Sequence, residues 1–142
     1  MSSTFTWPIR VYYEDTDTGG VVYYANYLKF FERARTEWLR AARIGQQQLC
    51  ETHGVLFVVK STAVDYHAPA KLDDELKLTV AVERLGRASV HFLQEAWRGN
   101  DLLCSGRIKV GCVDAAGFRP GAIPAPVLAQ IRRGMDAPRD SQ

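Results

Sequence analysis

The chain has 142 residues, of which 46% are hydrophobic and 24% are charged, a composition that suits one globular domain with its own core. Its formal net charge is +2, without a block of like charges, which argues against a nucleic-acid partner but allows local Lys and Arg clusters to hold a phosphorylated small ligand. Cys50, Cys104 and Cys112 have no paired spacing, so the sequence predicts neither a disulfide framework nor a zinc site.

The N-terminal segment is predicted to be a strand followed by an acidic turn. Alternate positions are apolar, as in a strand that buries one face: Phe5, Trp7, Ile9, Val11 and Tyr13. Pro8 cannot donate to a ladder, so we expect the first half of this strand at a sheet edge or outside the pairing. Residues 15–20 then form a turn, because Gly19 and Gly20 permit backbone angles that other residues resist.

A long helix is predicted from about residue 24 to residue 43. Apolar residues recur there at helical spacing, with charged residues on the other side. The apolar set is Tyr27, Phe30, Phe31, Ala34, Trp38, Ala41 and Ala42. Such a helix spans about 30 Å, enough to run the depth of a small sheet. Gly45 is expected to end it, and residues 46–52 are expected to form a short second helix before Gly54.

Four strands are predicted after these helices. The first covers residues 55–66, and its continuous apolar start, residues 55–59, indicates a strand that is central or covered on both faces. The second covers residues 75–83 and alternates cleanly, so one of its faces is expected to be wet. Residues 89–97 and 102–112 supply the last two. The linkers between the last three strands are short and contain turn formers, which predicts hairpins.

The predicted architecture is α+β: a strand, a long helix and four antiparallel strands, with the helix packed against a single curved sheet. One domain is expected over residues 1–133. A segment rich in Gly and Pro, residues 117–126, ends the sheet, and residues 127–132 are expected to form a short helix. Residues 134–142 are predicted to be a flexible tail.

The sequence also predicts a cytoplasmic protein that does not insert into membranes. The N-terminus lacks the basic region and apolar run of a signal peptide, and no stretch approaches the length that is needed to span a bilayer. The odd number of cysteines fits a reducing compartment.

The most informative motif joins the acidic turn to the long helix. It reads YEDTDTGGVVY over residues 13–23, then NY at 26–27 and FERAR at 31–35. In this motif the chain resembles the hotdog-fold acyl-CoA thioesterases, within them the 4-hydroxybenzoyl-CoA thioesterase-like group, and it is most similar to the Tol-Pal-associated acyl-CoA thioesterases. The resemblance continues through residues 57–59, 66–74, 89 and 112–114, so it covers nearly the whole chain.

The resemblance implies a hotdog fold, an antiparallel five-stranded sheet wrapped around a long central helix. It also implies dimers joined edge to edge with active sites between subunits, often assembled into tetramers. It places the catalytic carboxylate on Asp17 and the backbone N–H that polarises the thioester carbonyl on Tyr24. Arg87 and Ser89 match positions where related proteins meet CoA. The implied substrate is a thioester of CoA or of acyl carrier protein, hydrolysed without cofactor or metal.

The residues themselves support this chemistry. Thioester hydrolysis to a carboxylic acid and free CoA needs a nucleophile or general base and a stabilised oxyanion. The Asp17 carboxylate can attack to form an anhydride or can deprotonate water, and the sequence leaves both routes open. The start of the following helix offers unpaired N–H groups to the carbonyl oxygen. Glu32 and Arg35, three residues apart on the helix, either pair with each other, line the pocket or have a solvated or structural role.

Two other functions stay open at this point. A hotdog dehydratase would need a catalytic histidine paired with an acid, and His67 is the candidate. A non-catalytic acyl-CoA-binding or scaffolding module would bind CoA esters without turnover.

Simpler structural roles also exist for the motif residues. Asp17 or Thr18 can serve as the N-cap of the helix. The turn resembles the start of a calcium loop, but Asn26 stands where the bidentate Glu is required, so calcium binding is rejected. The three histidines lie on separate elements without ligand spacing, so no metal site is predicted.

Overall fold

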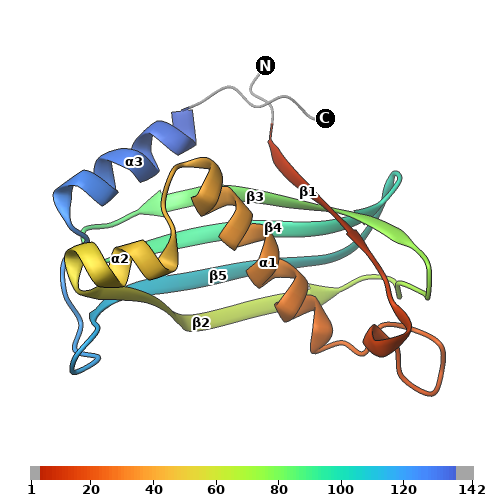
Figure 1. Cartoon of the computed structure of the whole chain (residues 1–142). Coiled ribbons are helices and arrows are strands. Elements are labelled where there is room, and N and C mark those ends of the chain that lie inside the picture. Colours follow the sequence, from red (N-terminus) through yellow and green to blue (C-terminus); the bar gives the residue numbers. More distant parts are fainter. Residues whose placement is uncertain (1–3, 137–142) are drawn as a thin grey trace.

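The computed structural model describes residues 4–136, which form a five-stranded antiparallel sheet curved around one long helix (Figure 1). The strands are β1 (Phe5–Arg10), β2 (Val55–Tyr66), β3 (Glu75–Leu85), β4 (Ser89–Arg98) and β5 (Asp101–Asp114). The helices are α1 (Asn26–Ala41), α2 (Gln46–His53) and α3 (Ala125–Asp136), and a short 3-10 helix covers Tyr13–Asp15. The strand order is β1-β3-β4-β5-β2. This arrangement confirms the predicted α+β architecture.

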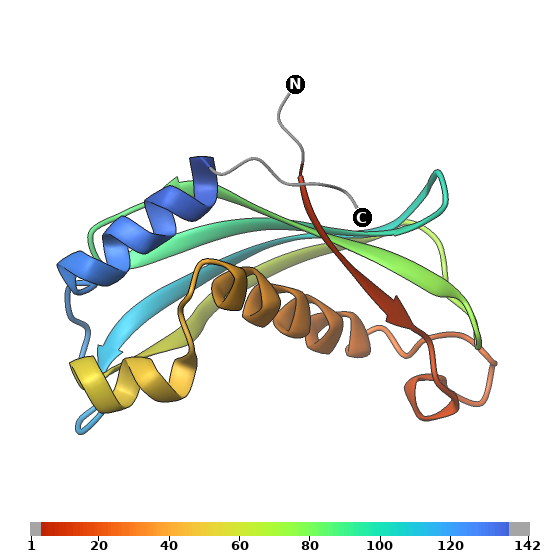
Figure 2. The same cartoon turned by 45° about the horizontal axis from the view of Figure 1, so that its top comes forward.

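The helix α1 runs across the concave face of the sheet (Figure 2), and the buried side chains of the two form the core between them. Phe30, Phe31 and Ala34 are fully buried, as their helical spacing predicts. Trp38 meets Phe92 of β4 edge-on, with ring centroids 5.9 Å apart. Fully burying one large apolar side chain stabilises a fold by roughly 1.5–3 kcal/mol. The contact between α1 and the sheet therefore fixes where the N-terminal end of α1 points.

The strand β1 forms one edge of the sheet. Within residues 4–136 its one partner strand is β3, and Pro8 stands opposite Lys77. Proline has no N–H to donate, and an edge strand tolerates this because the N–H groups on its outer side pair with no described strand. The predicted edge position of this strand is confirmed.

The strand β2 forms the other edge, so the prediction that it is central was wrong for the single chain. Among the described strands it pairs with β5 alone, and Val59 is 48% exposed. Val55 and Phe57 pack against the core, which accounts for only part of the apolar run. A long apolar strand with an unpaired side is a surface that another chain can cover.

The helix ends differ by a few residues from the predicted ones. The helix α1 begins at Asn26 because Tyr23, Tyr24 and Ala25 form a preceding turn. It ends at Ala41, and Arg43 then takes a left-handed backbone conformation with φ of 67°, so the chain turns two residues before the expected stop. The helix α2 ends at His53 and is followed by Gly54 with φ of 66°, a conformation that glycine adopts without strain.

The helix α3 is longer than predicted and continues through residues that were assigned to the tail. Gly134 is buried, and a Cβ atom there would lie 3.1 Å from the Trp38 ring. The missing side chain lets α3 lie against α1, so residues 134–136 remain helical. The rest of the predicted tail, residues 137–142, lies outside the described residues. None of the described helices combines the length and hydropathy that crossing a membrane requires.

Candidate active site

The turn that carries Asp17 is a closed loop at the N-terminal end of α1 (Figure 2). The Asp17 N–H donates to the Val21 carbonyl at 2.9 Å, and the Gly20 N–H donates to the Asp17 carbonyl at 3.0 Å. Gly20 has φ of +79°, which favours glycine. Asp17 is exposed, and its Oδ1 accepts the Gly19 N–H at 2.8 Å. The hydrogen bond to Oδ1 therefore orients the side chain, and no described residue bonds to Oδ2.

Asp15 has a different role although it lies only two residues away. It is 3% exposed, and its Oδ2 accepts the Tyr12 N–H at 2.9 Å. Its carbonyl accepts the Asn26 side-chain amide at 2.8 Å and the Tyr23 N–H at 3.1 Å. Oδ1 has no hydrogen bond among the described residues, and the Lys29 ammonium lies 4.0 Å from it. Asp15 thus ties the turn to the start of α1.

The backbone N–H groups of Tyr24 and Ala25, just before α1, have no acceptor among the described residues. The Asn26 N–H donates to the Tyr23 carbonyl at 2.8 Å, which closes a turn with Tyr24 and Ala25 at its centre. Within the described chain, the Tyr24 N–H donates to no acceptor. The N-cap residue of α1 is Ala25, which has no capping side chain. Asp17 and Thr18 are therefore not the N-cap, and the positive end of the helix dipole lies at this turn.

Aromatic side chains form one wall next to these N–H groups. Tyr24 contacts Tyr66 of β2 edge-on with centroids 5.8 Å apart, and Tyr23 lies 4.8 Å from Tyr24. Tyr23, Tyr24 and Tyr66 are exposed, whereas Tyr27 is buried, and the Tyr27 hydroxyl accepts the Ala70 N–H at 3.1 Å. Burial raises the pKa of Tyr27 and of Tyr66, which keeps both phenols neutral. One tyrosine belongs to the core and three line the surface beside the turn.

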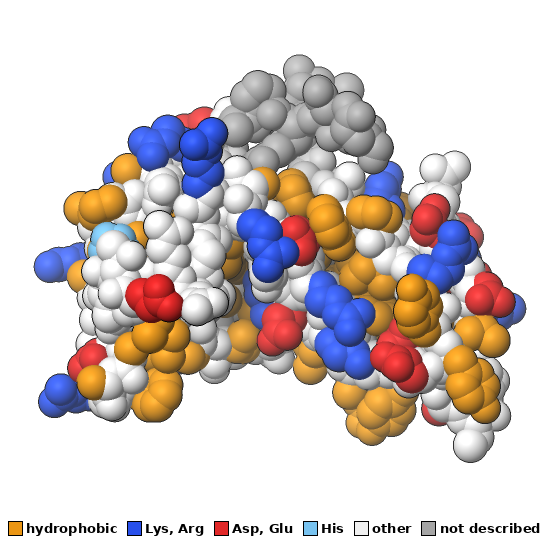
Figure 3. Space-filling model, in the orientation of Figure 1, with side chains coloured by type: hydrophobic (Ala, Val, Ile, Leu, Met, Phe, Trp, Pro, Cys, Tyr) orange, Lys and Arg blue, Asp and Glu red, His pale blue; other side chains and the backbone are white. Residues whose placement is uncertain are grey.

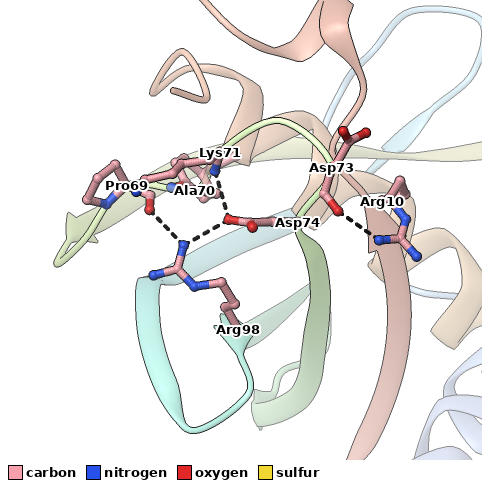
Figure 4. A network of polar contacts seen from close by, with 8 residues as sticks. Arg10, Pro69, Ala70, Lys71, Asp73, Asp74 and Arg98 are labelled. Atoms are coloured by element: carbon pink, nitrogen blue, oxygen red, sulfur yellow. Dashed lines mark hydrogen bonds and ion pairs between the residues drawn. The ribbon is translucent and has the colours of Figure 1, made fainter. Parts of the chain in front are cut away.

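A network of polar contacts supports the turn from the neighbouring loop, residues 67–74 (Figure 4). The Arg98 guanidinium donates to Asp74 Oδ2 at 2.8 Å and to the Pro69 carbonyl at 3.3 Å. The Lys71 N–H donates to the same Asp74 oxygen at 2.9 Å. Burial raises the pKa of Asp74, but the bonds from Arg98 and Lys71 outweigh it and lower the pKa below its ordinary value. The loop is thereby fixed to the β4–β5 hairpin.

This loop in turn holds the strand-like segment between Asp17 and Tyr24. The Val22 N–H donates to the Ala70 carbonyl at 2.8 Å, and Val21 forms a β-bridge with Lys71. Backbone pairing therefore positions both ends of the turn. Asp17 is the charged residue of the turn whose side chain is exposed to solvent. Such preorganisation is what charge stabilisation in a transition state requires.

Arg87 and Ser89 lie at the opposite end of β3 and are not brought to Asp17 within the chain. Arg87 is exposed, and its carbonyl accepts the Ile123 N–H at 2.9 Å. The Ser89 carbonyl accepts the Gly86 N–H at 2.8 Å. Because β3 has 11 residues, its two ends are roughly 33 Å apart at the usual rise per residue. Arg87 can approach the Asp17 turn only from another copy of the chain.

The histidines and cysteines offer no second catalytic centre among the described residues. His67 lies 3.2 Å from the Ser105 hydroxyl, and no described carboxylate bonds to it. All three cysteines are free, and burial raises the pKa of Cys104 to about 12, so this thiol is not a nucleophile. Within residues 4–136, no three His, Cys, Asp or Glu side chains lie close enough together to hold a metal ion.

A groove lies between α1 and β2. The sequence pointed only to Glu32 and Arg35 as possible lining residues. One part has a volume of about 300 Å³ and an adjoining part about 280 Å³. Glu32, Arg35 and Val59 line both parts. Over α1 the surface mixes acidic and basic side chains, with hydrophobic ones gathered on both sides (Figure 3). Of the roles considered for Glu32 and Arg35, the structure supports the lining of a pocket, and the two form no ion pair with each other.

Comparison with known proteins gives consistent matches. The family model of the thioesterase superfamily matches residues 19–105. The chain is similar to the acyl-CoA thioesterase YbgC of Haemophilus influenzae, with 47% identity over 91% of this chain and 95% of that protein. It is similar to the acyl-CoA thioester hydrolase YbgC of Escherichia coli O157:H7, with 44% identity over 94% of this chain and 100% of that protein. A crystal structure of a probable thioesterase from Bartonella henselae has a TM-score of 0.82 at 30% identity, covering 86% of this chain and 100% of that one.

Proposed function

The chain belongs to the thioesterase superfamily, and we propose that it hydrolyses acyl-CoA thioesters with the Asp17 carboxylate and the Tyr24 N–H as its catalytic groups. The family and the hotdog architecture agree with the resemblance of residues 13–35. The observation that carries the residue assignment is the loop itself, which presents an exposed carboxylate and an open N–H at its two ends.

The reaction places the thioester carbonyl at the start of α1. The Tyr24 N–H and the helix dipole stabilise the negative charge that develops on the carbonyl oxygen. Asp17 either attacks the carbonyl carbon, which gives an anhydride that water then cleaves, or removes a proton from water as the water attacks. In both routes the C–S bond breaks, the CoA thiolate leaves and takes up a proton, and the acyl group leaves as a carboxylic acid.

Hydrolysis of a panel of short, long and aromatic acyl-CoA esters tests this function. We expect free CoA thiol and carboxylic acid to be released in equal amounts. Tight binding of every ester without turnover would instead identify an acyl-CoA-binding or scaffolding module. The dehydratase alternative needs a histidine paired with an acid. Among the described residues, His67 bonds to the Ser105 hydroxyl and to no carboxylate, so this alternative gains no support.

We further propose that the working form is a dimer joined through β2, or a tetramer of two such dimers. The supporting observation is the unpaired side of β2 with Val59 exposed. Antiparallel pairing of two copies of β2 would continue the sheet and cover its apolar edge.

Light scattering at micromolar concentration checks the predicted assembly. We expect a mass of at least two chains for the wild type and a shift toward one chain for Val59→Lys, because a buried lysine opposes association at an apolar edge. The matched change on the other edge, Thr6→Lys, is expected to leave the mass unchanged. A monomeric wild type would contradict the proposal.

Such a dimer would also explain the distant position of Arg87. The start of β2 pairs with the end of β5, beside the start of β4, so Arg87 lies at the same end of the sheet as the start of β2. Asp17 lies beyond the other end of β2, because Val22 is bonded to Ala70 there. Antiparallel β2 pairing therefore brings Arg87 of the partner subunit to the end that carries Asp17. We propose that Arg87, with Ser89, contacts the CoA phosphates across this interface.

Arg87→Ala is expected to raise the KM for acyl-CoA severalfold with a smaller effect on kcat. The lost interaction is a charge-assisted hydrogen bond to phosphate, whose value is limited by solvent screening. A thioester of N-acetylcysteamine, which lacks the nucleotide, should be hydrolysed by this variant and by the wild type at similar rates. Lys77→Ala, at the opposite end of β3, serves as the control. Equal losses on both substrates would show that Arg87 acts through folding or chemistry.

The proposal also includes the cellular setting. Three free cysteines fit a cytoplasmic protein, and the resemblance of the sequence to Tol-Pal-associated enzymes supports a role beside that envelope system. Acyl carrier protein thioesters are a second class of substrate, because the groups assigned to the chemistry contact only the thioester.

A further inference from the structure

The groove between α1 and β2 has apolar walls and one buried cation. Its walls include Phe57, Val59, Val90 and Phe92. Arg35 lies among them and is only 8% exposed. A buried guanidinium is costly unless an anion or several hydrogen-bond acceptors surround it.

The contacts of Arg35 leave most of its donors unused. Nη1 donates to Gln94 Oε1 at 3.0 Å, and the Gln94 amide donates to the Phe31 carbonyl at 2.9 Å. A guanidinium has five N–H donors, and among the described residues Arg35 makes no other hydrogen bond and no ion pair. Burial lowers the pKa of Arg35, and the nearby Glu32 charge opposes this effect.

The unused nitrogens of Arg35 open into the groove. Among the described residues, the one fully enclosed side-chain polar atom without a hydrogen bond is Asp15 Oδ1. The free nitrogens of Arg35 are therefore not sealed in the core. Because Arg35 lines both parts of the groove, Gln94 fixes one side of the guanidinium and the other side is available to a ligand.

We propose that this groove receives the acyl group of the substrate and that Arg35 binds a carboxylate at the far end of the acyl chain. This inference rests on the proposed thioester hydrolysis and names its substrate class, the CoA monothioesters of dicarboxylic acids. The apolar walls suit the methylene chain. The planar guanidinium suits a terminal carboxylate, with which it forms paired charge-assisted hydrogen bonds.

The position of the groove suits this assignment. It starts beside the first turn of α1, at Leu28 and Lys29, and Lys29 lies 4.0 Å from Asp15 in the turn. Tyr24 and Arg35 are roughly 16 Å apart along the helix axis, and the Arg35 side chain leans back toward the N-terminus. Dicarboxylic chains of medium length can bridge this distance, whereas a malonyl group is too short.

Glu32 adds a second charge at the groove. It is exposed, lies one turn before Arg35 and raises the pKa of Arg35 against the effect of burial. An exposed carboxylate is screened by solvent, so the buried guanidinium dominates the binding of a terminal group. Glu32 still opposes an anion, which gives the proposal a second, opposite test.

The test compares kcat/KM for matched pairs of esters: adipyl-CoA with hexanoyl-CoA, suberyl-CoA with octanoyl-CoA, and sebacyl-CoA with decanoyl-CoA. For at least one pair we expect the wild type to prefer the dicarboxylic ester by about tenfold or more, the value of a charge-assisted hydrogen bond. Arg35→Met is expected to abolish this ratio, Arg35→Lys to keep part of it, and Glu32→Gln to increase it. Arg33→Met, an exposed arginine on the same helix, is the matched control.

The wild type alone also provides a measurement that does not depend on folding of a variant. Free suberate is expected to inhibit hydrolysis of octanoyl-CoA more strongly than free octanoate does. Equal kcat/KM for all wild-type pairs would overturn the assignment of Arg35, and so would equal losses on both members of a pair in folded Arg35→Met. Failure to hydrolyse any ester would instead overturn the proposed function.

Discussion

Asp17→Asn is expected to lower kcat by roughly a hundredfold to ten-thousandfold, the range lost when a positioned acid or base is removed. The geometry makes this substitution a clean test. Asp17 Oδ1 accepts the Gly19 N–H at 2.8 Å, and an asparagine oxygen can accept the same bond, so the turn keeps its shape. What the variant loses is the anion to which we assign the attack on the carbonyl or the deprotonation of water. Steady-state release of CoA thiol measures the loss, and calorimetric binding of a CoA ester checks that the site still binds.

Asp15→Asn is the matched control because it makes the same chemical change two residues away. Asp15 is 3% exposed and bonds to the Tyr12 N–H, so this change acts on the attachment of the turn. We expect a lower melting temperature and a much smaller loss of kcat than for Asp17→Asn. If Asp17→Asn kept near wild-type turnover of a good substrate, the catalytic assignment would be wrong.

The separate roles of these two aspartates illustrate what the sequence can and cannot predict. Both stand in one short motif, and spacing alone allows Asp17 to be no more than the cap of the helix. The family resemblance selects Asp17, but the structural reason lies in contacts with residues far along the chain. Val22 is held by Ala70, and the loop that contains Ala70 is held by Arg98. No local pattern encodes pairings between such distant segments.

The helices and strands were predictable because the spacing of apolar residues along the sequence indicates which residues are buried. The aromatic face of α1 and the alternation in β3 follow directly from which residues touch the core. The edge position of β2 was not predictable, because a continuous apolar run has the same composition whether its cover comes from the same chain or from another one.

The buried cation was visible in the sequence but could not be interpreted there. Arg35 follows Phe31 and Ala34 on the face that packs against the sheet, and Gln94 stands on the buried parity of β4. Each is a polar residue where an apolar one is expected. Only the fold shows that they meet, at 3.0 Å although they stand 59 positions apart in the sequence, and that the groove lies beside them.

Tyr24→Pro is expected to lower kcat by about a hundredfold or more, because it deletes one backbone N–H that we assign to the carbonyl oxygen. In other enzymes the loss of one such donor costs about 2.7–4 kcal/mol of transition-state stabilisation. The position in the turn suits proline. Tyr24 follows the first residue of a turn closed by the Asn26 N–H and the Tyr23 carbonyl at 2.8 Å, the position that proline favours in such turns. The Tyr24 N–H bonds to no described acceptor, so no native hydrogen bond is lost.

Tyr24→Ala separates the backbone donor from the side chain. It removes the aromatic contacts with Tyr23 and Tyr66 but keeps the N–H, so we expect kcat to stay within a few-fold of the wild type and any larger change to appear in KM. Melting temperatures of the two variants show whether either loses the fold. A Tyr24→Pro variant that is folded and retains the kcat of Tyr24→Ala would place the oxyanion donor elsewhere, with the next open N–H, that of Ala25, as the group to examine. The difference in kcat between the two variants therefore measures what the backbone donor contributes, since both lack the same phenol ring.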